Sequence, residues 1–261
     1  MINVIKVGGA VVEDPSSLDI LLDAFVKVEG PKALVHGGGR SATKLAEQLG
    51  IESRMVGGRR ITDAATLRIV TMVYAGLVNK NIVAQLQCLG CNALGLTGAD
   101  LNLIRAHRRP ITPEGIDFGF VGDVDAADGS RLLGLMSAGI IPVIAPLTHD
   151  GAGSLLNTNA DTIAQTVASA IANSAVNTPV TLTYCFELPG VMGDPSDDST
   201  LIPRLNEPMF RRLVADGTIA GGMIPKLENA FRALRSGIQK VRITNIRNLE
   251  GGTEITECSL E

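Results

Sequence analysis

The chain has few aromatic side chains: they make up 3% of its 261 residues, with two tyrosines and no tryptophan. Proteins that hold single-stranded nucleic acid stack its bases on aromatic rings, so this scarcity argues against that class. An excess of positive charge is also missing, because 23 Lys and Arg residues stand against 27 Asp and Glu residues, for a net charge of −4. No nucleic-acid partner is therefore expected.

Cysteine is scarce as well, and the four in this chain are too few for a disulfide framework at this length. Cys88 and Cys91 form a C-x-x-C pair, but it follows the predicted helical run 81–87 and brackets Gly90. Redox-active pairs begin at a helix N-terminus, where the dipole lowers the thiol pKa, and a zinc site would need a second pair. We expect reduced structural thiols in a cytoplasmic protein and no metal site.

The sequence lacks a clear leader or membrane anchor. Its N-terminus runs directly into a strand-like segment without a basic region. The longest uncharged stretch, residues 162–186, has the length of a membrane span, but Asn173, Asn177 and Pro179 interrupt it. We expect a helix, a turn and a strand there, and no membrane partner.

Apolar residues make up 45% of the chain and form short strand-like runs that alternate with amphipathic helical patterns. The alternation predicts an α/β fold: a three-layer α/β/α sandwich around a mainly parallel open sheet. Strands are expected at residues 2–7, 33–36, 93–96, 103–106, 119–124, 141–145, 180–185 and 240–244, with a hairpin at 54–62. Helices are expected at residues 16–28, 41–49, 64–89 (broken near Asn79), 130–138, 159–173, 207–216 and 224–236. We expect a single domain, 1–261, with a soft internal boundary near 145–155.

Glycine is in excess, with 29 residues, and two glycine runs directly follow the first two predicted strands. They are Lys6-Val7-Gly8-Gly9 and His36-Gly37-Gly38-Gly39. Open parallel sheets bind ligands at the carboxyl ends of their strands, where glycine lets backbone amides approach phosphate oxygens. Neither run matches the mononucleotide or dinucleotide fingerprints, and each alone is more often a tight turn. Together they favour a phosphate site, with His36 as a structural residue at a strand end.

A third glycine-containing segment, Gly221-Gly222-Met223-Ile224-Pro225-Lys226, has the features of a helix start. Pro225 suits the first helical turn. Lys226 lies in the same turn, where a cation is mildly unfavourable, and an anionic ligand nearby would explain its placement. The alternative is an exposed surface lysine.

Taken together, several segments resemble the amino acid kinase family, and within it the members that phosphorylate N-acylated glutamate. The resemblance is carried in chain order by Lys6-Val7-Gly8-Gly9, His36-Gly37-Gly38-Gly39, Gly58-Arg59-Arg60-Ile61-Thr62, Asn157-Thr158-Asn159-Ala160-Asp161 and Gly222-Met223-Ile224-Pro225-Lys226. It implies transfer of the γ-phosphoryl group of ATP, with Mg²⁺, to the γ-carboxylate of N-acetyl-L-glutamate or a related N-acylglutamate. The product would be an acyl phosphate on the route to arginine.

The resemblance also implies roles for individual residues. The catalytic groups would be Lys6, Lys226, Asp161, Gly9 and Gly38. The acceptor would contact Gly37, Gly38, Arg60, Asn157 and Asn159, although the neighbouring Arg59 leaves the arginine register open. ATP would contact Lys6, Gly8, Gly9, Glu187, Gly190, Gly222, Met223 and Lys226. Glu187 stands where the family carries an Asp, and the Asp-rich stretch 193–200 is either a solvated loop or a lid over the nucleotide.

The family pattern further implies an N-terminal lobe, about 1–150, for the acceptor and dimerisation, and a C-terminal lobe, about 151–261, for ATP. We expect a homodimer without arginine feedback, because arginine-inhibited members carry an additional N-terminal helix. Two other functions stay open: another carboxylate or carbamate kinase of the same fold, and a non-catalytic nucleotide sensor. Whether the acyl group is acetyl or succinyl also stays open.

Overall fold

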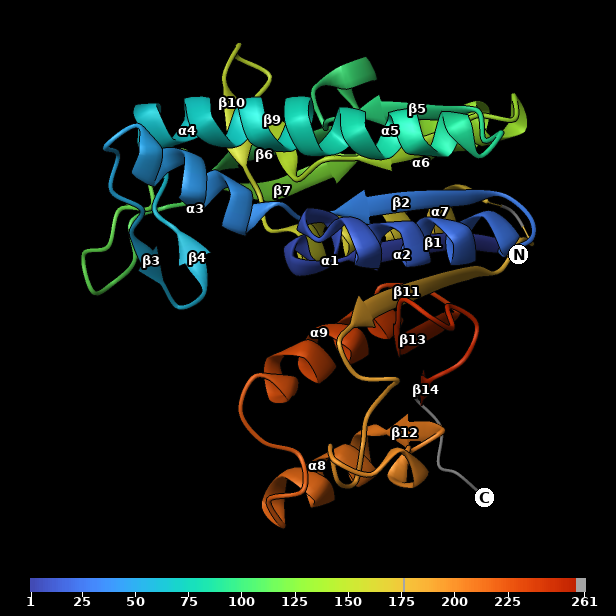
Figure 1. The fold of residues 1–261 in the computed structure, drawn as a ribbon. Coiled ribbons are helices and arrows are strands. Elements are labelled where there is room, and N and C mark those ends of the chain that lie inside the picture. Colours follow the sequence, from blue (N-terminus) through green and yellow to red (C-terminus); the bar gives the residue numbers. More distant parts are fainter. Residues whose placement is uncertain (176, 257–261) are drawn as a thin grey trace.

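The computed structural model describes residues 1–175 and 177–256, and its centre is an eight-stranded sheet (Figure 1). The strands lie in the order β12-β14-β13-β11-β1-β2-β8-β5. Their bounds are β1 (Ile2–Val7), β2 (Lys32–His36), β5 (Ala93–Leu96), β8 (Ile141–Ile144), β11 (Val180–Phe186), β12 (Arg204–Asn206), β13 (Lys240–Asn245) and β14 (Thr253–Thr256). Every neighbouring pair is parallel except β13 and β14, which are antiparallel, so the predicted mainly parallel sheet is confirmed.

Helices cover both faces of this sheet. One face carries α1 (Gly9–Glu13), α2 (Pro15–Lys27), α3 (Gly39–Gln48) and the run α4 (Ala64–Val70), η1 (Thr71–Val78) and α5 (Asn79–Cys88). The other carries α6 (Gly129–Ser137), α7 (Ala160–Ser174), α8 (Glu207–Ala215) and α9 (Met223–Arg235). Figure 1 shows α2 in front of β1 and β2, and α7 behind them. Each face has its own buried apolar cluster, which confirms the three-layer sandwich.

The central strand β1 shows how the sequence distributes side chains between the two layers. Ile2 and Val4 belong to one buried cluster, and Ile5 and Val7 to the other, as strand alternation requires. Lys6 has the parity of Ile2 and Val4, so it points to the layer that holds α7 and α9. A strand covered on both faces is apolar almost throughout, and the one lysine in this strand therefore stands out.

The chain leaves β1 and β11 toward opposite faces of the sheet, although these strands are neighbours. From β1 it enters α1 and α2, whose buried Val12 and Leu18 belong to one cluster. From β11 it leads through β12 into α8 and α9, whose Phe210 and Leu227 belong to the other. Such a switch point opens a crevice at the carboxyl ends of the two strands, which is where open α/β sheets bind ligands.

A smaller sheet and a hairpin complete the fold. The sheet has the order β10-β9-β6-β7, formed by β6 (Ile104–Arg108), β7 (Gly122–Ala127), β9 (Leu147–His149) and β10 (Leu155–Asn157). The hairpin consists of β3 (Met55–Val56) and β4 (Arg59–Arg60), as predicted. Single bridges from Thr62 to Gly119 and from Val121 to Asn157 connect the hairpin to this sheet.

The predicted elements agree with the structure within a few residues, with three kinds of difference. The short helical segments α1, η2 (Asp100–Asn102) and η3 (Asp198–Thr200) were not predicted. The break expected near Asn79 is wrong, because α4, η1 and α5 run on with helical backbone angles and η1 adopts π-helical bonding. The short strands β9, β10, β12 and β14 were missed, since three or four residues carry too little alternation to be recognised.

The helical segment Ala64–Cys88 is the one described helix long and apolar enough to cross a membrane by length and composition, and 44% of its most apolar window is buried within the fold. Its residues Ile69, Val73 and Ile82 lie in the core beneath it. The uncharged stretch at 162–186 contains most of α7 and all of β11, so the predicted helix and strand are confirmed.

Candidate active site

The two glycine turns after β1 and β2 pack directly against each other. Gly37 donates its backbone amide to the Val7 carbonyl at 3.1 Å. A Cβ on Gly37 would lie 2.8 Å from the Gly9 nitrogen, and one on Gly9 would lie 3.1 Å from the Gly38 nitrogen. Any larger residue would therefore separate the turns. Among the described residues no acceptor pairs with the amides of Gly9, Gly38 and Gly39, so these donors are available to an anion.

A cavity of about 240 Å³ opens beside these amides. Eight predicted site residues line it: Lys6, Gly9, Gly37, Gly38, Arg60, Asn157, Asn159 and Asp161. They come from the ends of β1, β2, β4 and β10 and from the first turn of α7. The structure thus brings together residues that lie up to 155 positions apart in the sequence.

Lys6 and Asp161 form the charged pair of this cavity. The Lys6 Nζ lies 2.7 Å from Asp161 Oδ1, and 9% of the lysine side chain is exposed against 27% of the aspartate. Asp161 also stands in the first turn of α7, where the helix dipole favours a carboxylate. Both the predicted orienting role and a helix-terminal role are therefore compatible with its position.

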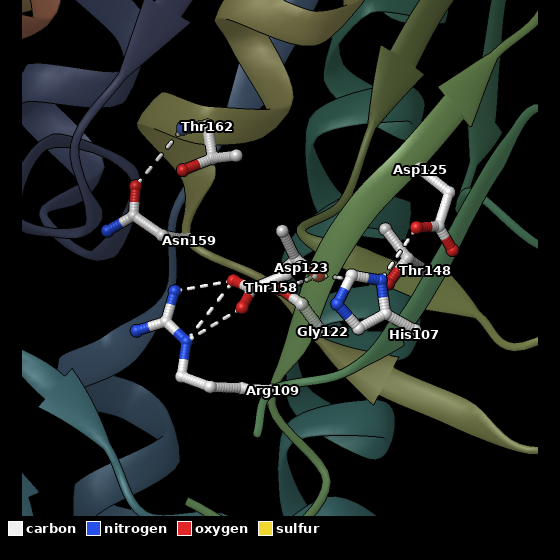
Figure 2. Close-up of polar contacts among 9 residues, drawn as sticks. All are labelled: His107, Arg109, Gly122, Asp123, Asp125, Thr148, Thr158, Asn159 and Thr162. Carbon is white, nitrogen blue, oxygen red and sulfur yellow. Dashed lines mark hydrogen bonds and ion pairs between the residues drawn. The ribbon is translucent and has the colours of Figure 1, made fainter. Parts of the chain in front are cut away.

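Asn157 and Asn159 each use one side-chain atom to support the fold. Asn157 Nδ2 donates to Thr62 Oγ1 at 3.0 Å, which joins β10 to the hairpin. Asn159 Oδ1 accepts from the amides of Asp161 and Thr162 and caps α7 (Figure 2). Asn157 Oδ1 and Asn159 Nδ2 have no protein partner among the described residues, so an acceptor and a donor face the cavity.

Lys226, which does not line the cavity, is connected to it by Phe186 at the end of β11. Its Nζ lies 3.9 Å from the centroid of the Phe186 ring, and the Lys6 Nζ lies 5.7 Å from the same centroid. Phe186 was missed as a site residue. The register provided a signal, because Lys6 pairs with Tyr184, and Phe186 lies two residues further on the same face. Two cations within 6 Å of the centroid of one aromatic ring, beside free amides, form a site for a multiply charged anion.

Comparison with known proteins agrees with this geometry. The sequence model of the amino acid kinase family matches residues 1–245. The chain belongs to the amino acid kinase family. It is 57% identical to an acetylglutamate kinase of Bacteroides fragilis, covering 97% of this chain and 96% of that one. A Bacteroides thetaiotaomicron acetylglutamate kinase is 59% identical, covering 93% of each chain. Among solved structures, smu.665 of Streptococcus mutans UA159 has a TM-score of 0.75 at 26% identity, covering 98% of this chain and 99% of that one.

The remaining predicted nucleotide residues of this amino acid kinase do not line the cavity described above. Exposed Glu187 follows β11, with Oε2 3.9 Å from Lys226 Nζ. Gly8 caps α1, whereas Gly222 and Met223 begin α9. Gly190 is buried instead, and a Cβ there would lie 2.5 Å from Leu201 and 2.7 Å from Thr253 Oγ1. The neighbours of Gly190 therefore leave no room for a side chain. This packing does not show whether its backbone contacts ATP.

The Asp-rich stretch 193–200 of the kinase is an exposed loop that closes on itself. The Gly193 amide donates to the Thr200 carbonyl at 2.9 Å, and Thr200 Oγ1 donates to the Asp194 carbonyl at the same distance. A bridge between Met192 and Leu201 joins its two ends. These contacts fit the solvated-loop interpretation.

His36 lies beneath the glycine turn and is fully buried. Its Nδ1 lies 2.7 Å from the Gly37 carbonyl, and its Nε2 lies 3.1 Å from Asn79 Nδ2. Asn79 Nδ2 also donates to the Val143 carbonyl at 2.9 Å. Burial lowers the pKa of His36 to about 4, since the Gly37 contact opposes it only in part. The imidazole is therefore neutral at physiological pH, as its predicted structural role requires.

Arg60, the predicted acceptor arginine, is held by three contacts within the kinase fold. Its Nη1 donates to Ser53 Oγ at 2.7 Å, and its Nη2 donates to the Gly39 carbonyl at 2.9 Å and to Thr43 Oγ1 at 2.8 Å. These bonds join the hairpin to the N-terminus of α3. Arg59, next to it, lines the same cavity.

Proposed function

We propose that this amino acid kinase transfers the γ-phosphoryl group of ATP to the γ-carboxylate of N-acetyl-L-glutamate or a related N-acylglutamate. The observation that carries the proposal is the convergence of Lys6 and Lys226 on Phe186 beside the free amides of the glycine turns. The names of relatives that are 57% and 59% identical over nearly the whole chain support it.

The chemistry requires positioning and neutralisation of charge more than proton transfer. A γ-carboxylate is already ionised at neutral pH and needs no general base. Lys6 and Lys226 would hold oxygens of the transferring group from two sides, and Asp161 would orient the lysines. The amides of Gly8, Gly9 and Gly38 would stabilise the charge that develops as the group moves. The Gly37 amide, expected in the same role from the sequence, is donated to the Val7 carbonyl instead.

The acceptor and the nucleotide would occupy the two sides of Phe186. Arg60, Asn157 and Asn159 would bind the acceptor, whereas Glu187, Gly190, Gly222 and Met223 would lie along the nucleotide. Mg²⁺ bound to ATP would supply further neutralisation of phosphate charge. Within residues 1–175 and 177–256 no group of three or more His, Cys, Asp or Glu could hold a metal, which is compatible with an ion carried by the nucleotide.

We propose that two lobes, which share the central sheet, bind different substrates. Residues 1–150 would bind the acceptor and form the dimer contact, and residues 151–261 would bind ATP. Arg60 and the glycine turns support the first assignment, and Lys226 supports the second. The segment with Asn157 and Asp161 reaches from the second lobe into the acceptor cavity.

An acyl phosphate product would serve arginine biosynthesis in the cytoplasm, where ATP is available. The thiols of Cys88, Cys91 and Cys185 are free, which is compatible with a reducing compartment.

The activity is tested by incubating the chain with ATP, Mg²⁺, hydroxylamine and either N-acetyl- or N-succinyl-L-glutamate. Hydroxylamine traps an acyl phosphate as a coloured hydroxamate, and we expect hydroxamate with at least one acceptor. Absence of hydroxamate with both would contradict the proposal. Faster turnover of free glutamate, aspartate or carbamate would favour another kinase of this fold, and ATP binding without turnover would favour a nucleotide sensor.

We further propose a homodimer formed through α4, η1, α5 and the edge strand β5, which lie at one end of the sheet (Figure 1). Four large apolar side chains on these elements, or directly after α5, are 38% to 57% exposed: Met72, Leu77, Leu89 and Leu94. Apolar groups gathered on neighbouring elements, together with an unpaired strand edge, are typical of an interface.

The dimer is tested by light scattering after gel filtration. The wild type should elute as a dimer, and the double variant Met72→Glu/Leu77→Glu should elute as a folded monomer because it places two charges in the contact. Ile111→Glu, at a residue that is 63% exposed elsewhere, is the matched control and should stay dimeric. A monomeric wild type would overturn the assignment.

A further inference from the structure

Lys6 and Lys226 are held in different ways, although both would act on the transferring group. Lys6 has a close carboxylate, because its Nζ lies 2.7 Å from Asp161 Oδ1 and its side chain is 9% exposed. Within the described residues the only ion pair of Lys226 is with Glu187, whose Oε2 lies 3.9 Å from Nζ. Glu187 is 75% exposed, so water screens this attraction. Lys226 is therefore held by something other than a carboxylate.

The Phe186 ring provides that contact. Lys226 Nζ lies 3.9 Å from the ring centroid, well within the distance of about 6 Å at which an aromatic face attracts a cation. The ring attracts the ammonium group through its quadrupole and carries no net charge. Lys226 therefore keeps its full positive charge for an anion, which a tightly bound carboxylate would partly neutralise.

The fold fixes the plane of this ring. Phe186 is the last residue of β11, which lies between β1 and β13 in the middle of the sheet. Its ring stacks on the buried ring of Tyr184, with the centroids 6.2 Å apart and the planes 4° from parallel. A lysine side chain has many rotamers, so a ring held by a central strand and a buried neighbour gives it a preorganised support.

Lys6 approaches the same ring from the neighbouring strand. Its Nζ lies 5.7 Å from the Phe186 centroid, and Lys6 pairs with Tyr184 in the parallel register of β1 and β11. Lys226 comes from the first turn of α9, more than 200 residues further along the chain. Phe186 is thus the side chain that both lysines share, and it fixes where one ammonium group lies relative to the other.

We propose that Phe186 is a positioning residue for the phosphoryl transfer, whose ring holds the Lys226 ammonium in place relative to Lys6 without neutralising it. The inference rests on the proposed function, which supplies the transferring group. A packing role would require only apolar volume, so leucine would replace phenylalanine. A positioning role requires an aromatic face.

The test compares Phe186→Leu, Phe186→Tyr and Phe186→Trp in the hydroxamate assay. We expect Phe186→Leu to lower kcat about tenfold, as expected for the loss of a partly buried cation–π contact, and to leave the KM of the acceptor within about threefold. Tyrosine and tryptophan keep an aromatic face and should recover most of kcat. Thermal unfolding shows which variants are folded, and Phe186→Met takes the place of a leucine variant that is not.

Phe120→Leu is the matched control. Phe120 is partly buried, as Phe186 is, and Arg108 Cζ lies 3.6 Å from its ring centroid, but its side chain does not line the cavity. Its replacement should leave kcat within about threefold of the wild type. An unchanged kcat in Phe186→Leu would overturn the positioning role. So would an equal loss in the leucine, tyrosine and tryptophan variants, or in Phe120→Leu.

Fluorescence separates this inference from the proposed function. The chain has no tryptophan, so Phe186→Trp carries a single indole at the site. An ammonium group against an indole alters its emission, so Lys226→Met in this background should change the spectrum. Lys44→Met, at an exposed residue that does not line the cavity, should not.

The two readouts fail independently. A spectrum that stays the same on Lys226→Met would overturn the contact between ring and lysine, whether or not the enzyme turns over. If the wild type forms no hydroxamate but the spectrum responds, the proposed activity fails and the contact stands. Hydroxamate formation by the wild type, with a tenfold loss in Phe186→Leu and a spectrum that responds, supports both.

Discussion

Replacing Lys226 by methionine is expected to lower kcat about 100- to 1,000-fold, because removal of one preorganised donor to a developing charge typically costs that much. Lys226 sits in the first turn of α9, and its Nζ lies 3.9 Å from the centroid of the Phe186 ring, which the Lys6 Nζ also approaches. The nearest carboxylate, Glu187, is exposed and 3.9 Å away, so the lysine is not held by a tight ion pair of its own. Its position is best explained by a phosphoryl group between the two lysines.

The measurement is steady-state turnover in the hydroxamate assay, with thermal unfolding to confirm that the variant is folded. Methionine keeps the aliphatic stem of the lysine, so the melting temperature should change little. Lys44→Met is the matched control, because Lys44 is exposed on α3 and does not line the cavity. A folded Lys226→Met variant with kcat within threefold of the wild type would contradict the proposed mechanism.

The parts of the site that were predictable from sequence are those fixed by local chain geometry. The glycine runs after Val7 and His36 stand directly behind apolar strands, and strand ends of a parallel sheet share one edge. Asn159 and Asp161 likewise stand at a recognisable helix start. Local patterns of this kind place residues near each other without long-range information.

The parts that escaped prediction depend on contacts between distant segments. Nothing near Phe186 in the sequence shows that two lysines, 220 positions apart, meet over its ring. The Gly39 carbonyl and Thr43, which accept hydrogen bonds from Arg60, belong to α3 and lie 21 and 17 residues before that arginine. Gly190 packs against Leu201 and Thr253, neighbours that the local sequence around it does not indicate, and its contact with ATP stays a prediction.

The structure also gives a local cause for the conformation of the glycine turn. Asn79 Oδ1 accepts from Lys80 Nζ at 3.1 Å, so its Nδ2 is the donor toward Val143 and His36. His36 Nε2 must then be an acceptor, and Nδ1 carries the proton that is donated to the Gly37 carbonyl. Protonation of Nε2 would place two donors against each other in a buried site. His36 is therefore a positioning residue that acts only while neutral.

This network predicts that the protein loses about 3 kcal/mol of stability through His36 between pH 7 and pH 4. The pKa of His36 is about 4 in the folded protein, against roughly 6.5 for an unfolded histidine. As the pH falls below about 6.5, His36 binds a proton in the unfolded state. In the folded state it does so only near pH 4. The free energy of unfolding therefore falls across that window and is fully retained above it.

The measurement is urea unfolding of the wild type and of His36→Asn at pH 7, 6, 5 and 4. At pH 7 the variant should be the less stable, because the Gly37 carbonyl and Asn79 lose their partner. The difference in free energy of unfolding between the two proteins should decrease by about 3 kcal/mol toward pH 4, because only the wild type has the histidine whose protonation favours the unfolded state. A difference between wild type and His36→Asn that stays constant with pH would show that folded His36 takes up its proton as readily as the unfolded chain does, and the neutral tautomer that holds the glycine turn would then be wrong.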